Sequence, residues 1–202
     1  MILRRLGDYA AHPDPLVAAC NRIALLVASN QPFYPLYLWW LVGGDWGTAC
    51  WTFLSTPFFA SVPIVARRHA LAGRAMLPLA GIANGLVSAK AFGVASGVEL
   101  FLIPCALIAL LAFRPAERLV TLALAAGVLG AALVHGHYGV PLGRFDPPQY
   151  AHFRRLNVAS VTTLSVVVLW TLSRARASSA RRRSRSSPPS PSPPCPSTDR
   201  RA

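Results

Sequence analysis

Apolar residues occur along the chain in long continuous runs, separated by short polar or charged segments. The runs do not alternate with period two, as a half-buried β-strand would. Several of them approach or reach the roughly 20 residues that a helix needs to cross a hydrocarbon core. The pattern therefore predicts an all-α fold, a polytopic membrane helix bundle with six transmembrane helices. The six predicted spans are residues 23–43, 48–66, 75–93, 98–113, 119–134 and 156–173.

These spans divide the chain into a cytoplasmic N-terminal segment (1–15), a transmembrane domain (16–173) and a C-terminal tail (174–202). The tail consists mainly of Arg, Ser and Pro. It has too little apolar surface to offset the entropy lost on ordering, so we expect a disordered C-terminal tail. Whether the tail is functional or is the product of a shifted reading frame stays open.

Positive charge dominates: the chain has 20 Lys and Arg against 7 Asp and Glu, a net charge of +13 and a mean hydropathy of +0.43. The arginines lie at the ends of apolar runs and in the tail, without interleaved aromatic residues, so we expect no nucleic-acid partner. The connections 67–74 and 114–118 are arginine-rich, whereas 43–47 has no arginine. This bias places both termini in the cytoplasm of a bacterium, with the spans in its inner (plasma) membrane.

Membrane lipids are the first expected partner. Basic residues just inside a membrane attract anionic lipids by about 1 kcal/mol each. A homodimer and a cytoplasmic signalling partner remain open as further partners. The tail residues expected to contact lipid headgroups are Arg181, Arg182, Arg183 and Arg185.

Polar side chains interrupt the first predicted span at Asn30, Gln31 and Tyr34, beside Pro32 and Pro35. Unpaired polar groups in lipid cost several kcal/mol, so this face should look toward other helices or water. One interpretation is interhelical hydrogen bonding, worth about 0.6 kcal/mol for each bond. The other is a ligand-lined cavity. Polar partners in the other spans are Thr52, Ser55, Asn84, Ser88, Asn157 and Ser160.

Lys90 and Glu99 flank the connection between the third and fourth predicted spans. A tight hairpin would bring them within reach of an ion pair. Ionisable residues within spans are candidates for function, although both side chains could also extend from the interface into water. The hypothetical ligand-binding set is therefore Asn30, Gln31, Tyr34, Asn84, Lys90 and Glu99.

His135 and His137 are weak candidates for a metal or haem site, since two imidazoles suit a transition metal. A solvated loop is the other interpretation. Cys20, Cys50, Cys105 and Cys195 have no metal-binding spacing and are expected to be free thiols. The chain contains no nucleophile elbow, zinc-protease motif or phosphate-binding loop, so we expect no enzyme activity and no cofactor.

Four stretches are similar to membrane regions that precede output domains in bacterial signalling proteins. They are NQPFYPLYLWWLVG, LSTPFFASVP, GIANGLVSAKAFGVASGVELFLIPCAL, and HGHYG followed by a span that opens with RRLN. The chain thus resembles, over residues 16–173, the six-helix sensor region of adenylate/guanylate cyclases or sensor histidine kinases. The resemblance implies an input or anchoring module.

The chain departs from these families after Ser173, where no coiled-coil heptad, kinase motif or cyclase domain follows. We therefore expect a membrane sensor-like or anchoring module of a bacterial signalling system, with no catalytic domain of its own. A small transporter or channel and an integral-membrane metal- or haem-dependent enzyme stay open as alternatives. A transporter would be expected to show inverted repeats, whereas the prolines of the first two spans lack counterparts in the last two.

Overall fold

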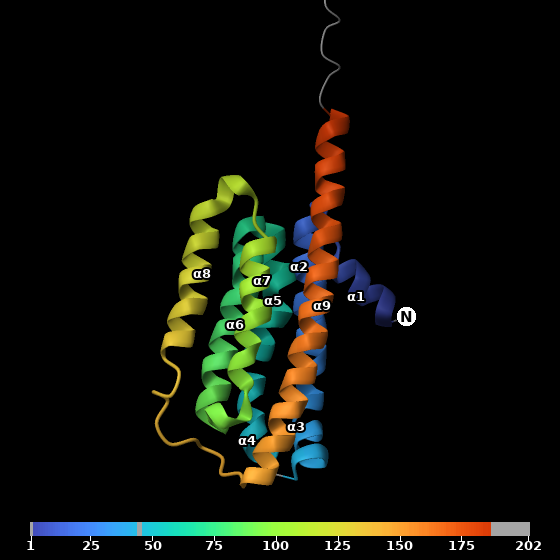
Figure 1. Cartoon of the computed structure of the whole chain (residues 1–202). Helices are drawn as coiled ribbons and strands as arrows, with labels where there is room; N and C mark the ends of the chain where they lie inside the picture. Colours follow the sequence, from blue (N-terminus) through green and yellow to red (C-terminus); the bar gives the residue numbers. More distant parts are fainter. Residues whose placement is uncertain (1, 44–45, 187–202) are drawn as a thin grey trace, which may run out of the picture.

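A computed structural model describes residues 2–43 and 46–186, which form helices and loops without any β-strand (Figure 1). The all-α prediction is confirmed for these residues. Four helical stretches are long and apolar enough to cross a membrane: Gly47–Arg68, Ala70–Phe92, Pro115–Leu133 and Pro147–Arg181. They overlap four of the six predicted spans and suggest that the protein is associated with a membrane.

The first predicted span is an interrupted helix. It consists of α2 (Pro15–Asn30), the 3₁₀ turn η1 (Gln31–Phe33), α3 (Tyr34–Tyr37) and the π-helical turn η2 (Leu38–Val42). Pro32 and Pro35 cannot donate a backbone hydrogen bond, so the regular α-helical pattern stops where they occur. The four pieces still follow one another as a rod beside α9 (Figure 1). A short helix, α1 (Ile2–Ala10), precedes them.

The next two helices form a tight hairpin. α4 (Trp46–Ala49) and η3 (Cys50–Ser55) lead into α5 (Thr56–Arg68), and α6 (Ala70–Phe92) follows after one extended residue, His69. A Cβ atom added to Gly73 would lie 2.5 Å from Cα of Ala66. Only glycine permits the two backbones to come so close at this position.

The fourth predicted span is shorter than expected. The turn η4 (Val94–Ser96) precedes it, and η5 (Val98–Phe101) and α7 (Leu102–Leu111) make up its apolar helical part, Val98–Leu111. The turn η6 (Pro115–Glu117) leads to α8 (Arg118–Leu133). Four α8 leucines are at least 60% exposed, as suits a helix that faces lipid: Leu119, Leu122, Leu129 and Leu133.

The last helix, α9 (Pro147–Ser186), differs from the prediction at both ends. Its first turn is stabilised by reciprocal hydrogen bonds between Asp146 and Gln149, and the helix begins at a proline, which suits this position. The helix thus begins well before the predicted span, 156–173, which lies within it. Disorder from residue 174 was also predicted, but α9 remains helical to Ser186.

Two contacts explain why α9 continues past the predicted boundary. Arg176 donates hydrogen bonds to the carbonyls of Leu110, Leu111 and Phe113, at 2.7, 2.8 and 3.0 Å, and so caps the end of α7. The Arg174 guanidinium lies 4.1 Å from the centre of the Trp170 ring. Arg and Ala, frequent in residues 174–183, also favour helix, while the prolines begin only at residue 188. The rest of the predicted tail, 187–202, lies outside the described residues.

Besides a smaller group around Ile82, Leu102 and Cys105, two buried clusters hold the bundle together. One lies near the arginine-rich end, where α2, α5, α6, α7, α8 and α9 meet around residues such as Ile23, Phe59, Leu77 and Leu172. The other joins η2, α6, η5 and α9 around Leu38, Phe92, Val98 and Phe153 at the opposite end. Between these clusters lies the cavity described next.

Candidate ligand-binding cavity

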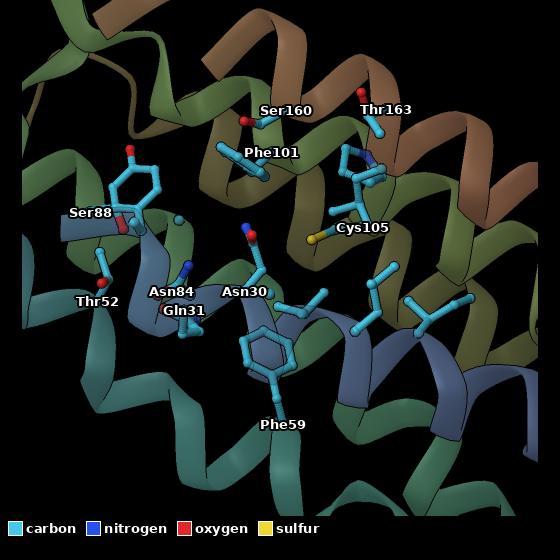
Figure 2. Close-up of a pocket in the computed structure, with 18 of the residues that line it drawn as sticks. Asn30, Gln31, Thr52, Phe59, Asn84, Ser88, Phe101, Cys105, Ser160 and Thr163 are labelled. Atoms are coloured by element: carbon cyan, nitrogen blue, oxygen red, sulfur yellow. The ribbon is translucent and has the colours of Figure 1, made fainter. Parts of the chain in front are cut away.

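A cavity of about 590 Å³ lies between α2, α5, α6, α7 and α9 (Figure 2). Its volume falls in the range of about 300–1,000 Å³ that is typical of small-molecule sites. Much of the wall is apolar. Its apolar lining residues include Ile23, Val27, Phe59, Leu77, Ile108 and Leu164.

One wall of the cavity is polar: Gln31, Thr52 and Asn84 line it, and Ser55, which does not itself line the cavity, joins Gln31 to Asn84. Gln31 Nε2 donates to Ser55 Oγ at 2.8 Å, and Ser55 Oγ lies 2.8 Å from Asn84 Oδ1. Ser55 Oγ also lies 2.9 Å from the carbonyl of Thr52. A serine hydroxyl carries one proton, so it satisfies only one of these two acceptors at a time. The unused acceptor can take a hydrogen bond from another donor.

A second polar chain starts at the cavity and ends in the core. The Tyr34 hydroxyl donates to Asn157 Oδ1 at 3.0 Å, and Asn157 Nδ2 donates to the carbonyl of Ser96 at 2.9 Å. Tyr34 lines the cavity, whereas Asn157 is fully buried outside it. Asn157 therefore acts as an interhelical tie between α3, α9 and the η4 turn.

The cavity opens between the end of α2 and the middle of α9. Asn30 and Phe33 on one side, and Thr163 on the other, line the cavity and are also exposed. Figure 2 shows Asn30 pointing toward the side of the cavity where Phe101 and Ser160 lie. Both helices run along the bundle axis, so the opening is on the side of the bundle and not at either end.

The structure brings together four of the six residues in the predicted ligand-binding set. Asn30, Gln31, Tyr34 and Asn84 all line the cavity. The sequence did not single out the small residues Gly81 and Gly85, which share a face of α6 with Ser88 and leave room for the cavity. Their spacing of four and three residues was the available signal.

Lys90 and Glu99 do not form the ion pair that a tight hairpin could allow. Lys90 Nζ donates to the carbonyls of Tyr138 and Val140, both at 2.9 Å. The Glu99 carboxylate instead contacts Nδ1 of His135. The connection between α8 and α9 folds against the end of α6 and supplies these partners. The prediction compared only the two neighbouring spans and did not consider this connection.

The second oxygen of Glu99, Oε1, is buried without a hydrogen-bond partner. Burial and the nearby Glu99 carboxylate raise the pKa of the Tyr138 phenol above its ordinary value. Neither Lys90 nor Glu99 lines the cavity. They belong to the contacts that fix the α8–α9 connection against the bundle.

The two candidate metal ligands lie in that same connection. His135 contacts Glu99, and Nδ1 of His137 lies 3.0 Å from the carbonyl of His135. Across residues 2–43 and 46–186, no group of three or more His, Cys, Asp and Glu side chains is placed to hold a metal ion. Cys20 and Cys105 are buried free thiols, Cys50 lies in η3, and Cys195 lies outside the described residues.

The residues predicted to contact lipid headgroups begin near the end of α9. Arg181 is exposed on that helix. Arg182, Arg183 and Arg185 belong to the helical backbone, and their side chains lie outside the described part of the structure. The prediction placed them on a disordered segment, whereas they extend a continuous helix.

No protein-family model, curated protein or solved structure matches the chain. The site itself is therefore the starting point for an inference about function.

Proposed function

We propose that the chain is a six-helix membrane bundle that binds a small, uncharged, amphipathic molecule in its central cavity. It would act as a sensor-like or anchoring module of a bacterial signalling system. In this proposal the rod from α2 to η2 is the first span and Val98–Leu111 is part of the fourth. The bundle lies in the inner membrane with both termini in the cytoplasm, as the arginine distribution favours.

The single observation that carries the proposal is the composition of the cavity wall. Amide and hydroxyl groups of Gln31, Asn84 and Thr52 line the cavity, with Ser55 joining Gln31 to Asn84, whereas most of the other lining residues are apolar. None of the lining residues, all within the described part of the chain, is charged. A ligand with one hydrogen-bonding end and an apolar body satisfies both walls, whereas an ion would lose its hydration without a counter-charge.

The side opening supports entry from the bilayer. A molecule that partitions into lipid can pass between Asn30 and Thr163 without crossing the polar ends of the bundle. The same helix, α9, lines the cavity and continues to Ser186. If α9 has two orientations with different affinities for the ligand, binding would shift the populations of these orientations. A partner protein that contacts the end of α9 could then respond to the change.

The test uses a matched pair of variants on α9. Thr163→Trp places a large ring at the opening, whereas Thr162→Trp makes the same change at a neighbouring exposed position that does not line the cavity. The purified chain in detergent is heated with a short-chain quinone, a medium-chain alcohol or a medium-chain monoacylglycerol. A probe at about 100 times its Kd stabilises the folded state by about 2.7 kcal/mol.

We expect at least one probe to raise the unfolding temperature of the wild type and of Thr162→Trp, and to leave that of Thr163→Trp unchanged. No shift with any probe would contradict the proposed ligand class. Equal shifts in both variants would place the binding site elsewhere on the protein.

A further inference from the structure

A second depression lies at the arginine-rich end of the bundle, away from the central cavity. It is a groove of about 520 Å³ between the start of α8, the end of α7 and the extension of α9. We call it the arginine groove. Its apolar floor includes Leu110, Phe113 and Leu122, and the arginines along it are Arg114, Arg118 and Arg176.

The three arginines retain unused hydrogen-bond donors. Arg176 uses Nε and one terminal nitrogen on the carbonyls that end α7, which leaves its other terminal nitrogen unused. Arg114 contacts Asp14 through one nitrogen at 2.6 Å. Arg118 is exposed, and its side chain makes no hydrogen bond or ion pair within the described parts of the chain.

The local charge is positive after the neighbouring acids are considered. Asp14 offsets one of the three guanidinium charges. The other nearby acid, Glu117, receives hydrogen bonds from buried Arg74 at 2.6 and 2.8 Å, and one from the Arg114 backbone at 2.8 Å. Glu117 is therefore neutralised by a partner outside the groove and does not oppose an anion within it.

We propose that the arginine groove binds an anionic phospholipid. The phosphate would lie against Arg114, Arg118 and Arg176, where guanidinium groups can form paired hydrogen bonds to its oxygens. An acyl chain would cover the floor formed by Leu110, Phe113 and Leu122. The combination of cationic rim and apolar floor selects a lipid, because free phosphate leaves the floor exposed to water.

This site is separate from the central cavity and does not depend on the ligand proposed there. It also differs from a diffuse attraction of the basic tail, because it requires particular arginines from α8 and α9 together with an apolar surface between them. The matched control is Arg68, an exposed arginine at the end of α5 that does not line the groove.

The test titrates the purified full chain in detergent micelles with phosphatidylglycerol or phosphatidylcholine of identical acyl chains, and counts bound lipids by native mass spectrometry. We expect phosphatidylglycerol to bind more tightly. Arg118→Gln should weaken it about five-fold, the factor that corresponds to one basic residue near a membrane surface. Arg68→Gln should leave it unchanged, and excess inorganic phosphate should not displace the lipid.

A second variant tests the floor without changing any charge. Thr121→Trp fills the groove, and we expect it to abolish selective binding of phosphatidylglycerol while circular dichroism shows an intact helical fold. It also decides the matter if Arg118→Gln fails to fold. Equal weakening by Arg118→Gln and Arg68→Gln, displacement by inorganic phosphate, or unaltered binding to Thr121→Trp would each overturn the proposal.

Discussion

The close approach of α5 and α6 can be tested with one methyl group. In Gly73→Ala, the new Cβ would lie 2.5 Å from both Cα and Cβ of Ala66 and 2.7 Å from its backbone nitrogen. Carbon atoms in contact are normally about 3.5–4.0 Å apart, so the two helices would have to separate by about 1 Å. Backbone atoms cannot rotate away as a flexible side chain can, so the whole hairpin must adjust.

Gly130 on α8 is the matched control, because a Cβ added there meets nothing within 4 Å. Overpacking costs typically about 1–3 kcal/mol, so Gly73→Ala should be destabilised by roughly that amount. Gly130→Ala should gain about 0.5–1 kcal/mol, since alanine loses less backbone entropy than glycine in a helix.

The measurement is equilibrium unfolding in mixed micelles with increasing sodium dodecyl sulfate, followed by the far-ultraviolet circular dichroism of the helices. The two alanine variants should move the unfolding midpoint in opposite directions from the wild type. If Gly73→Ala were as stable as Gly130→Ala, α5 and α6 would not approach as the structure places them, and the reasoning would be refuted.

Two further predictions concern the arginine-rich end. Arg74 is 2% exposed and donates to Ala70, Ala112 and Glu117; Arg74→Met should cost about 3 kcal/mol in the same unfolding assay, because it leaves Glu117 without its main counter-charge. Arg68→Met, at an exposed position, should change the midpoint little, and equal effects of the two would mean that the buried pair is unimportant. Arg176→Gln should speed amide hydrogen exchange in residues 174–181, since it removes the hydrogen bonds that join α9 to the end of α7. Ala177→Gln, at an exposed position, is the control. Unchanged exchange in Arg176→Gln would show that the end of α9 stays helical without its hydrogen bonds to α7.

The sequence predicted the gathering of polar groups better than the shape of the elements. Asn30, Gln31 and Tyr34 could be assigned to the cavity because a polar group in an apolar span needs a polar partner or access to water, although Asn30 lies at the exposed opening. The partner of Gln31 is Ser55, one of the polar residues noted in the second predicted span. The free-energy cost of burying an unpaired polar group depends only on its immediate surroundings. This prediction therefore does not depend on the exact boundaries of the spans.

The errors arose where contacts distant in sequence decide the outcome. Glu99 pairs with His135, which is 36 positions away, because Gly93 and Gly97 adopt φ of +79° and +74° and turn the chain between α6 and η5. Arg176 joins α9 to carbonyls more than 60 positions earlier. Neither contact leaves a periodic signal, and composition alone suggested that the residues after Ser173 would not be ordered.

The 40-residue length of α9 has a mechanical consequence. At a rise of about 1.5 Å per residue the helix measures roughly 60 Å, about twice the thickness of a hydrocarbon core. With a pivot at Ser160, beside the cavity, a tilt of about 5° displaces the far end at Ser186 by roughly 3 Å. Under the proposed sensor function, such a tilt would turn a change too small to open the bundle into a displacement comparable to the size of a side chain, once the Arg176 hydrogen bonds to the end of α7 are released.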